Sequence, residues 1–294
     1  MMILEWLKAM LYGIVEGITE WLPISSTGHL ILIQDLIPFA FTSDQRFLDE
    51  FSEMFQVVIQ LGAILAVVVL FWQRLWPFSR KKTHAEKRGT WMLWFKVVVA
   101  SLPAAIIGIV GDKILEKVTG KDIDGWLYNS LVVAAALIVY GVAFILLEHF
   151  HKGKTARVEC VEDISFQNAL LIGAFQSLSI VPGTSRSGST ILGAMSLGLS
   201  RTAGAEFSFF MAIPVMVGAS GIKMLGFFDY LSECSVTVPV DAWIALAVGC
   251  VVSFVVSLMA IRFLMDFVKK HSFASFGVYR IILGAVVLIW WLVR

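Results

Sequence analysis

Charged side chains are scarce in this chain. Lysine, arginine, aspartate and glutamate make up 15% of its 294 residues, whereas 58% are hydrophobic. This composition excludes an ordinary soluble domain and indicates a protein that crosses a membrane several times. Neither sign of charge prevails, because the net charge is only +1. We therefore expect neither a nucleic-acid partner nor a polybasic membrane anchor.

Cysteine is also rare, and its spacing carries no signal. The three cysteines, Cys160, Cys234 and Cys250, have no metal-ligand or redox spacing, so we interpret them as structural. The first ten residues lack a small-residue cleavage site, and we expect them not to be a cleaved signal peptide. Gly153-Lys154-Thr155 lacks the upstream glycine and the preceding strand of a P-loop.

Long apolar runs dominate instead. A membrane-spanning helix needs about 20 mostly apolar residues. The sequence predicts six such helices: Met54–Trp72, Trp91–Val110, Trp126–Leu147, Glu206–Phe228, Ala242–Met265 and Phe276–Val293. Four shorter apolar segments flank two polar motifs and predict two re-entrant helical hairpins: Ile3–Val15 with Ile24–Phe39, and Ile164–Val181 with Ser187–Leu199.

The two halves of the chain resemble each other. An offset of 160 residues aligns Gly13 with Gly173, Glu16 with Gln176, Ser25 with Ser185, Thr27 with Ser187 and Gly28 with Gly188. We predict one membrane domain built from two repeats, residues 1–151 and 152–294, each a hairpin plus three spans. Three is an odd number, so the second repeat is predicted to be inverted.

The basic residues predict the orientation. They concentrate in the loops 73–90 and 148–163 and at Lys269 and Lys270, all on one side of the predicted topology, whereas loop 229–241 has none. The three lysines of loop 111–125 weaken this bias without reversing it. The positive-inside rule makes the basic side cytoplasmic. The two hairpins then enter from opposite sides, and their tips are predicted to meet near the midplane.

The first polar motif runs from Glu16 to His29. Glu16 and Glu20 are four residues apart, so they share one helical face and are candidates to bind Mg²⁺ or Ca²⁺, or to supply a general acid. Ser26 precedes His29 by three residues, a spacing that suits an activated nucleophile. Alternatively, the serines only cap a helix, His29 is structural and the glutamates face water.

The second motif, Pro182–Thr190, supplies a cation. Arg186 suits bidentate phosphate binding, and the hydroxyls and glycine amides around it suit an anion nest. The alternative is an arginine that extends to the membrane surface. Ionisable groups at membrane depth favour function. We assign the substrate contacts to eight residues: Ser25, Thr27, Gly28, Thr184, Ser185, Ser187, Gly188 and Thr190.

Other ionisable residues carry weaker signals. Lys96 and Lys223 interrupt apolar runs, and an ion pair or a position near the membrane surface explains them as well as function does. Arg262 and Arg280 are interpreted as interfacial anchors. Glu206 is expected to cap a helix or to line the central cavity.

The motifs Glu16-Gly-Ile-Thr-Glu-Trp-Leu-Pro-Ile-Ser-Ser-Thr-Gly-His29 and Pro182-Gly-Thr-Ser-Arg-Ser-Gly-Ser-Thr190 closely resemble the signatures of undecaprenyl-diphosphate phosphatases of the bacitracin-resistance type. The resemblance covers nearly the whole chain. It implies a bacterial inner-membrane enzyme that removes the terminal phosphate of undecaprenyl diphosphate, recycling the lipid carrier for peptidoglycan synthesis and conferring bacitracin resistance. It also implies a periplasm-facing site, a divalent cation and a catalytic group of Glu16, Glu20, Ser26, His29 and Arg186.

Several alternatives stay open at this point. Ser26 could attack phosphorus with His29 taking its proton, His29 could itself accept the phosphate, or an activated water could attack. The runner-up function is a transporter or flippase for a lipid phosphate or small anion, which inverted repeats suit equally well. Gly141 and Gly218-Ala219 would allow close helix packing within or between subunits, which is compatible with a homo-oligomer.

Overall fold

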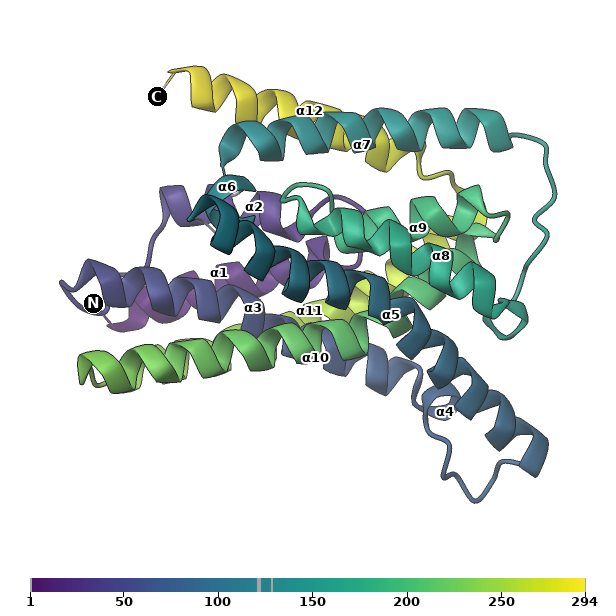
Figure 1. The fold of residues 1–294 in the computed structure, drawn as a ribbon, viewed down its shortest axis with the longest axis horizontal. Helices are drawn as coiled ribbons and strands as arrows, with labels where there is room; N and C mark the ends of the chain where they lie inside the picture. The colour runs from purple at the N-terminus through teal and green to yellow at the C-terminus, as the bar shows by residue number, and fades with distance from the viewer. Residues whose placement is uncertain (1, 121–122, 128, 294) are drawn as a thin grey trace.

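The computed structural model describes residues 2–120, 123–127 and 129–293, and within these ranges it contains helices and no strand. Figure 1 shows long helices running roughly side by side, with shorter helices among them. Six helices are long and apolar enough to cross a membrane, as predicted. They are α3 (Gln45–Leu70), α5 (His84–Thr119), α7 (Ser130–His151), α10 (Arg201–Cys234), α11 (Val240–Lys270) and α12 (Ala274–Val293).

Local signals explain where these helices begin and end. Thr83 and Glu86 form a capping box at the start of α5, and Gly120 ends that helix in the left-handed conformation with a φ of 76°. The third span does not start at Trp126 as predicted. Trp126 belongs to the short helix α6 (Ile123–Leu127), and α7 begins after Asn129, whose side chain accepts a hydrogen bond from the Val132 N–H.

The predicted short segments are helix pairs. The first pair is α1 (Met2–Thr19) and α2 (Ser26–Leu36), and the second is α8 (Phe166–Ser177) and α9 (Arg186–Ser196). The short helix α4 (Trp72–Leu75) and the 3₁₀ turns η1 (Val161–Asp163) and η2 (Leu178–Ile180) complete the chain. In each pair the break between the helices falls on a polar motif, so both motifs lie on loops held by helices on either side.

Glycines let the short helices lie against the long ones. Helix α1 packs along α11, and α8 packs along α5. A Cβ atom at Gly173 of α8 would lie 2.0 Å from the Ala100 carbonyl oxygen of α5, and one at Gly62 of α3 would lie 2.1 Å from the Cys250 carbonyl oxygen of α11. Small residues of this kind are what allow helix backbones to touch in membrane proteins. This packing fixes the position of both motif loops.

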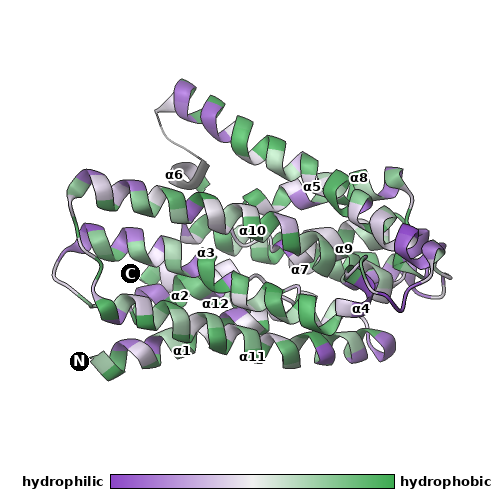
Figure 2. Ribbon diagram, turned by 90° about the horizontal axis from the view of Figure 1, so that it is seen from below, coloured by the Kyte–Doolittle hydropathy of each residue, from purple (hydrophilic) through white to green (hydrophobic). Residues whose placement is uncertain are grey.

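The outer surface is apolar along much of the helix lengths. Figure 2 shows hydrophobic residues along the long helices, with hydrophilic ones gathered mainly toward their ends. Large apolar side chains are exposed on every spanning helix, among them Phe95, Val139 and Val251. A soluble protein rarely exposes such continuous apolar surface, whereas lipid covers it in a membrane protein. The chain is therefore a multi-pass membrane protein.

Candidate active site

The two motif loops have the same backbone conformation at equivalent places. Ser25 and Ser185 both have a φ of 72°, in the left-handed region that non-glycine residues rarely adopt. Each serine caps the following helix, because its side chain accepts a hydrogen bond from Gly28 N–H at 3.3 Å or Gly188 N–H at 3.1 Å. Residues held in such rarely populated backbone conformations cluster at functional sites, so both loops are candidates for one.

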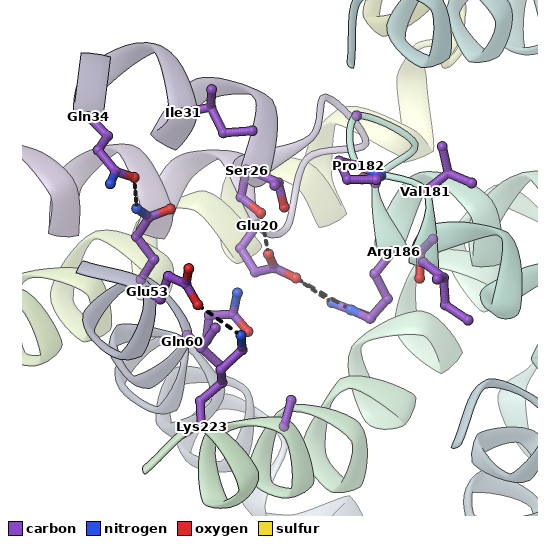
Figure 3. Close-up of a pocket in the computed structure, with 18 of the residues that line it drawn as sticks. Glu20, Ser26, Ile31, Gln34, Glu53, Gln60, Val181, Pro182, Arg186 and Lys223 are labelled. Atoms are coloured by element: carbon purple, nitrogen blue, oxygen red, sulfur yellow. Dashed lines mark hydrogen bonds and ion pairs between the residues drawn. The ribbon is translucent and has the colours of Figure 1, made fainter. Parts of the chain in front are cut away.

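Glu20 connects the two loops. It follows the last residue of α1, and its N–H still donates to the Glu16 carbonyl at 3.0 Å. Its carboxylate accepts from Ser26 Oγ at 2.7 Å through Oε2, and from Arg186 Nη2 at 3.0 Å through Oε1. Figure 3 shows Ser26, Glu20 and Arg186 in line. Ser26 of the first loop and Arg186 of the second, which lies 166 residues from Glu20 in sequence, thus share one carboxylate.

Further bonds hold Arg186 and the second loop in place. Arg186 Nη1 donates to the Ser208 carbonyl of α10 at 2.7 Å, and its guanidinium lies over the Trp21 ring at 5.9 Å. Ser187 Oγ donates to the Glu20 carbonyl at 3.0 Å, and Thr190 Oγ1 lies 2.6 Å from Ser208 Oγ. Arg186 is therefore a fixed, largely buried cation rather than an arginine extended to the membrane surface.

Glu16 is fully buried, and neither of its carboxylate oxygens has a hydrogen-bond partner within the described ranges. A buried carboxylate without partners costs several kcal/mol if it is charged, by an order-of-magnitude estimate, so such a group calls for a ligand or a proton. Glu20, one turn later, is its nearest acidic neighbour in sequence. This pair is the predicted cation site.

His29 is held away from Ser26. Its Nδ1 lies 2.7 Å from the Ser25 carbonyl oxygen, and its Nε2 lies 2.8 Å from the Tyr279 hydroxyl of α12. Since a carbonyl only accepts, Nδ1 carries the hydrogen in this arrangement. Ser26 was proposed as a nucleophile activated by His29, but in the structure its hydroxyl donates to Glu20.

Arg280 supports both motif loops, a role that the sequence did not predict. It was expected at the membrane interface, but its side chain is completely buried. Its guanidinium donates to the Pro23 carbonyl of the first loop at 3.0 Å, and to the Gly183 and Thr184 carbonyls of the second at 2.8 Å each. An arginine fork satisfies several carbonyls at once. No sequence pattern marks it, because its partners come from two distant loops.

A cavity of about 980 Å³ opens in front of the Glu20 carboxylate. Among the predicted site residues, Glu20, Ser26, Thr27, Ser185 and Arg186 line it, whereas Glu16, Ser25, Gly28, His29, Thr184, Ser187, Gly188 and Thr190 do not.

The rest of the wall comes from α2, α3 and α10, and Gly125 of α6, the start of α7 and residues 179–183 complete it. It carries three carboxylates, Asp35, Asp49 and Glu53, and one cation, Lys223, which pairs with Glu53 at 3.1 Å. Lys96, the other lysine in an apolar run, donates instead to the Glu162 carbonyl at 2.7 Å. Glu206 does not line this cavity as proposed but pairs with Arg74.

The comparisons with known proteins agree with one another. Residues 9–286 match the family described as bacitracin resistance protein BacA. A protein of Acetivibrio thermocellus named undecaprenyl-diphosphatase is 50% identical over 289 residues, which cover 98% of both chains. Proteins of the same name from Enterococcus faecalis and Streptococcus pyogenes serotype M4 are 50% and 48% identical over at least 97% of each chain. The chain therefore belongs to the bacitracin resistance protein BacA family.

Proposed function

We propose that this protein is an integral membrane phosphatase that hydrolyses undecaprenyl diphosphate to undecaprenyl phosphate and inorganic phosphate. In a bacterial cell this reaction recycles the lipid carrier of peptidoglycan synthesis and confers bacitracin resistance. The observation that carries the proposal is the Ser26–Glu20–Arg186 arrangement at the cavity wall, in a chain about 50% identical to undecaprenyl-diphosphatases. The transport alternative is not favoured, because these relatives are named as enzymes.

Positioning comes first in the proposed reaction. The polyprenyl tail stays in lipid while the diphosphate enters the cavity. Arg186 neutralises the terminal phosphate, and its planar donor fork fixes that group beside Ser26. Arg186 is paired with Glu20 in the structure, so the phosphate oxygens would displace the Glu20 carboxylate from part of the guanidinium.

Ser26 then attacks the terminal phosphorus. A bond forms from its Oγ to phosphorus, the bond from phosphorus to the bridging oxygen breaks, and undecaprenyl phosphate leaves with the electron pair. The Ser26 proton passes to Glu20, whose Oε2 already accepts it at 2.7 Å. Water then attacks the phosphorus of the phosphoserine, the bond from phosphorus to Ser26 Oγ breaks, the proton on Glu20 returns to Oγ, and inorganic phosphate leaves. Attack by His29 or directly by water remains the alternative, and His29 is held by Ser25 and Tyr279.

A divalent cation, Mg²⁺ or Ca²⁺, fits the residues present. Four carboxylates and only two cations line the cavity, so it does not neutralise a diphosphate by itself. Glu16 and Glu20 would hold the ion, and the unpartnered oxygens of Glu16 are of the type that both ions prefer. The described residues hold no group of three His, Cys, Asp or Glu side chains that forms a metal site, so phosphate oxygens would complete the shell. The bound ion would offset negative charge on the phosphates.

Two inverted repeats, 1–151 and 152–294, with re-entrant hairpins explain the packing. The pairing of α1 with α11 mirrors the pairing of α8 with α5, and α3–α10 and α7–α12 each pair equivalent helices. The cavity lining includes Asp49 near the start of α3 and Lys223 in the second half of α10, and α10 leads into the loop without basic residues. These features support an inner-membrane protein with a periplasmic mouth. A homo-oligomer stays a prediction.

The decisive assay is phosphate release from undecaprenyl diphosphate by the purified protein in detergent, with Mg²⁺, Ca²⁺ or a chelator. We expect turnover that the chelator abolishes. Ser26→Ala should reduce kcat at least 1,000-fold by order of magnitude, since it removes the attacking atom. Ser179→Ala, at a serine that also lines the cavity, is the matched control. Undiminished turnover by Ser26→Ala excludes the serine nucleophile, and no phosphate release with either ion refutes the enzyme proposal.

A further inference from the structure

A second cavity, of about 350 Å³, lies at the other end of α9 from Arg186. Met195 near the end of α9 lines it, together with the last residues of α7 and α11 and the first residues of α10. Helix α9 has 11 residues, so its two ends are about 15 Å apart. This cavity is therefore separate from the candidate active site, and the proposed reaction makes no use of it.

Its wall is basic. Lys154, Arg201 and Lys269 line it with His151, and no aspartate or glutamate does. These four side chains come from four places: the end of α7, the following loop, the start of α10 and the end of α11. A basic wall assembled from separate elements suits an anion that contacts several sides at once.

The charges of this wall are only partly compensated. Arg201 donates to Glu148 at 2.8 Å, and Lys269 pairs with the exposed Asp266 at 3.1 Å. Lys154 has no ion-pair partner in the described part of the chain. An anion in the cavity would therefore contact at least one cation, Lys154, whose charge is not already compensated.

Backbone and hydroxyl donors add to this charge. Helix α10 starts at Arg201 and is 34 residues long. The side chain of Ser200, its N-cap, accepts a hydrogen bond from the Ala203 N–H. The N–H groups of Arg201 and Thr202 belong to the first turn, where no intrahelical acceptor exists. Thr155 and Thr202 contribute hydroxyls to the same wall.

We propose that this cavity binds a phosphate group. Donors on several sides of the cavity match the oxygens of a tetrahedral anion, whereas a carboxylate would engage one side only. Two sources share this chemistry: the phosphodiester of an anionic phospholipid, and free inorganic phosphate. The apolar side chains of Phe150 and Phe263, 63% and 55% exposed, extend from α7 and α11 nearby and offer a surface for acyl chains.

The bound group would connect α7, α10 and α11 and so stabilise the folded protein by mass action. The test is thermal unfolding of the purified full-length protein in a neutral detergent. The additions are potassium phosphate, potassium chloride at equal ionic strength, phosphatidylglycerol, and phosphatidylcholine as the neutral lipid. A double variant, Lys154→Met with Lys269→Met, removes two cations of the wall. Lys113→Met with Lys117→Met removes two exposed lysines of α5 as the control.

We expect phosphate, phosphatidylglycerol or both to raise the Tm of the wild type and of the control above the matched chloride or phosphatidylcholine sample. The double variant should need at least tenfold more of the same addition for half the shift, because the loss of a single charged contact is about a factor of ten in affinity. A response to phosphate alone identifies the free anion, and a response to phosphatidylglycerol alone identifies the lipid. The proposal is overturned if neither phosphate nor phosphatidylglycerol raises the Tm of the wild type above its chloride or phosphatidylcholine sample. It is also overturned if the Tm of the double variant rises as that of the wild type does. Since the wild-type response needs no turnover, this result is independent of the proposed enzyme function.

Discussion

Replacing Arg280 should uncouple the two motif loops. Arg280→Met removes the donors to three buried carbonyls, one in the first loop and two in the second. Each buried carbonyl left without a donor costs about 1–3 kcal/mol, so roughly 3–9 kcal/mol is lost from the stability of the folded protein. Misplacement of reacting groups by about 1 Å costs about 100-fold in rate. We expect kcat for phosphate release to fall at least 100-fold and the Tm to drop by several degrees.

Arg280→Lys separates charge from geometry. Lysine retains the charge and three donors but lacks the planar fork, so we expect a loss of about tenfold in kcat, equal to about 1.4 kcal/mol. KM should change little in this variant, because Arg280 does not line the cavity.

The control is Arg262→Met, which removes an exposed arginine of α11. Activity is measured on polyprenyl diphosphate at a temperature where the unfolding curve shows each variant folded. A folded Arg280→Met variant with kcat within twofold of the wild type would refute the reasoning, because the loops would then keep their positions without this residue.

Three further changes test the site and its support. Glu20→Gln weakens contacts to two side chains and should lower kcat at least 1,000-fold by order of magnitude without unfolding the protein, measured by phosphate release and far-UV circular dichroism. Tyr279→Phe removes the hydrogen bond to His29 but keeps the stacked ring, so kcat should fall about three- to tenfold, and a larger loss would give His29 a direct chemical role. Gly62→Ala places a Cβ 2.1 Å from a carbonyl oxygen and should lower the Tm strongly, whereas Gly108→Ala, which meets no atom within 4 Å, should leave it unchanged or raised.

The spans could be predicted from the sequence because hydrophobicity and length are local properties. All six predicted spans correspond to long helices, and the errors are at their ends. Trp126 lies on α6 because Asn129 caps α7, and Trp72 lies on α4 because α3 ends at Leu70. The polar motifs were found for the same reason, since charged residues stand out in an apolar chain.

Contacts between distant segments could not be predicted in the same way. The three-residue spacing of Ser26 and His29 suggested a serine activated by histidine, yet Ser26 is the first residue of α2 and donates to Glu20, six residues earlier. Arg280 lies 257 residues from Pro23, and carbonyl acceptors are present at every residue. Sequence therefore identified the chemical groups but not which of them meet.

The 160-residue offset also shows how one loop shape supports two different chemistries. Ser25 and Ser185 have the same φ of 72° and cap the following helix in the same way, so the two loops are alike at the point where that helix begins. The next position is Ser26 in one loop and Arg186 in the other, and each begins its helix. Both side chains reach the same carboxylate, that of Glu20, from opposite sides.

Position 180, equivalent to Glu20, is isoleucine. A second carboxylate there would compete for Arg186 with both Glu20 and the substrate phosphate. Because residue 180 carries no carboxylate, Glu20 can accept the Ser26 proton while Arg186 binds the phosphate. An Ile180→Glu variant should therefore raise KM for the diphosphate, because the new carboxylate would hold the guanidinium that the substrate needs. Ile180→Gln, which adds the same bulk without charge, is its control, and an equal KM in both variants would show that only bulk matters at this position.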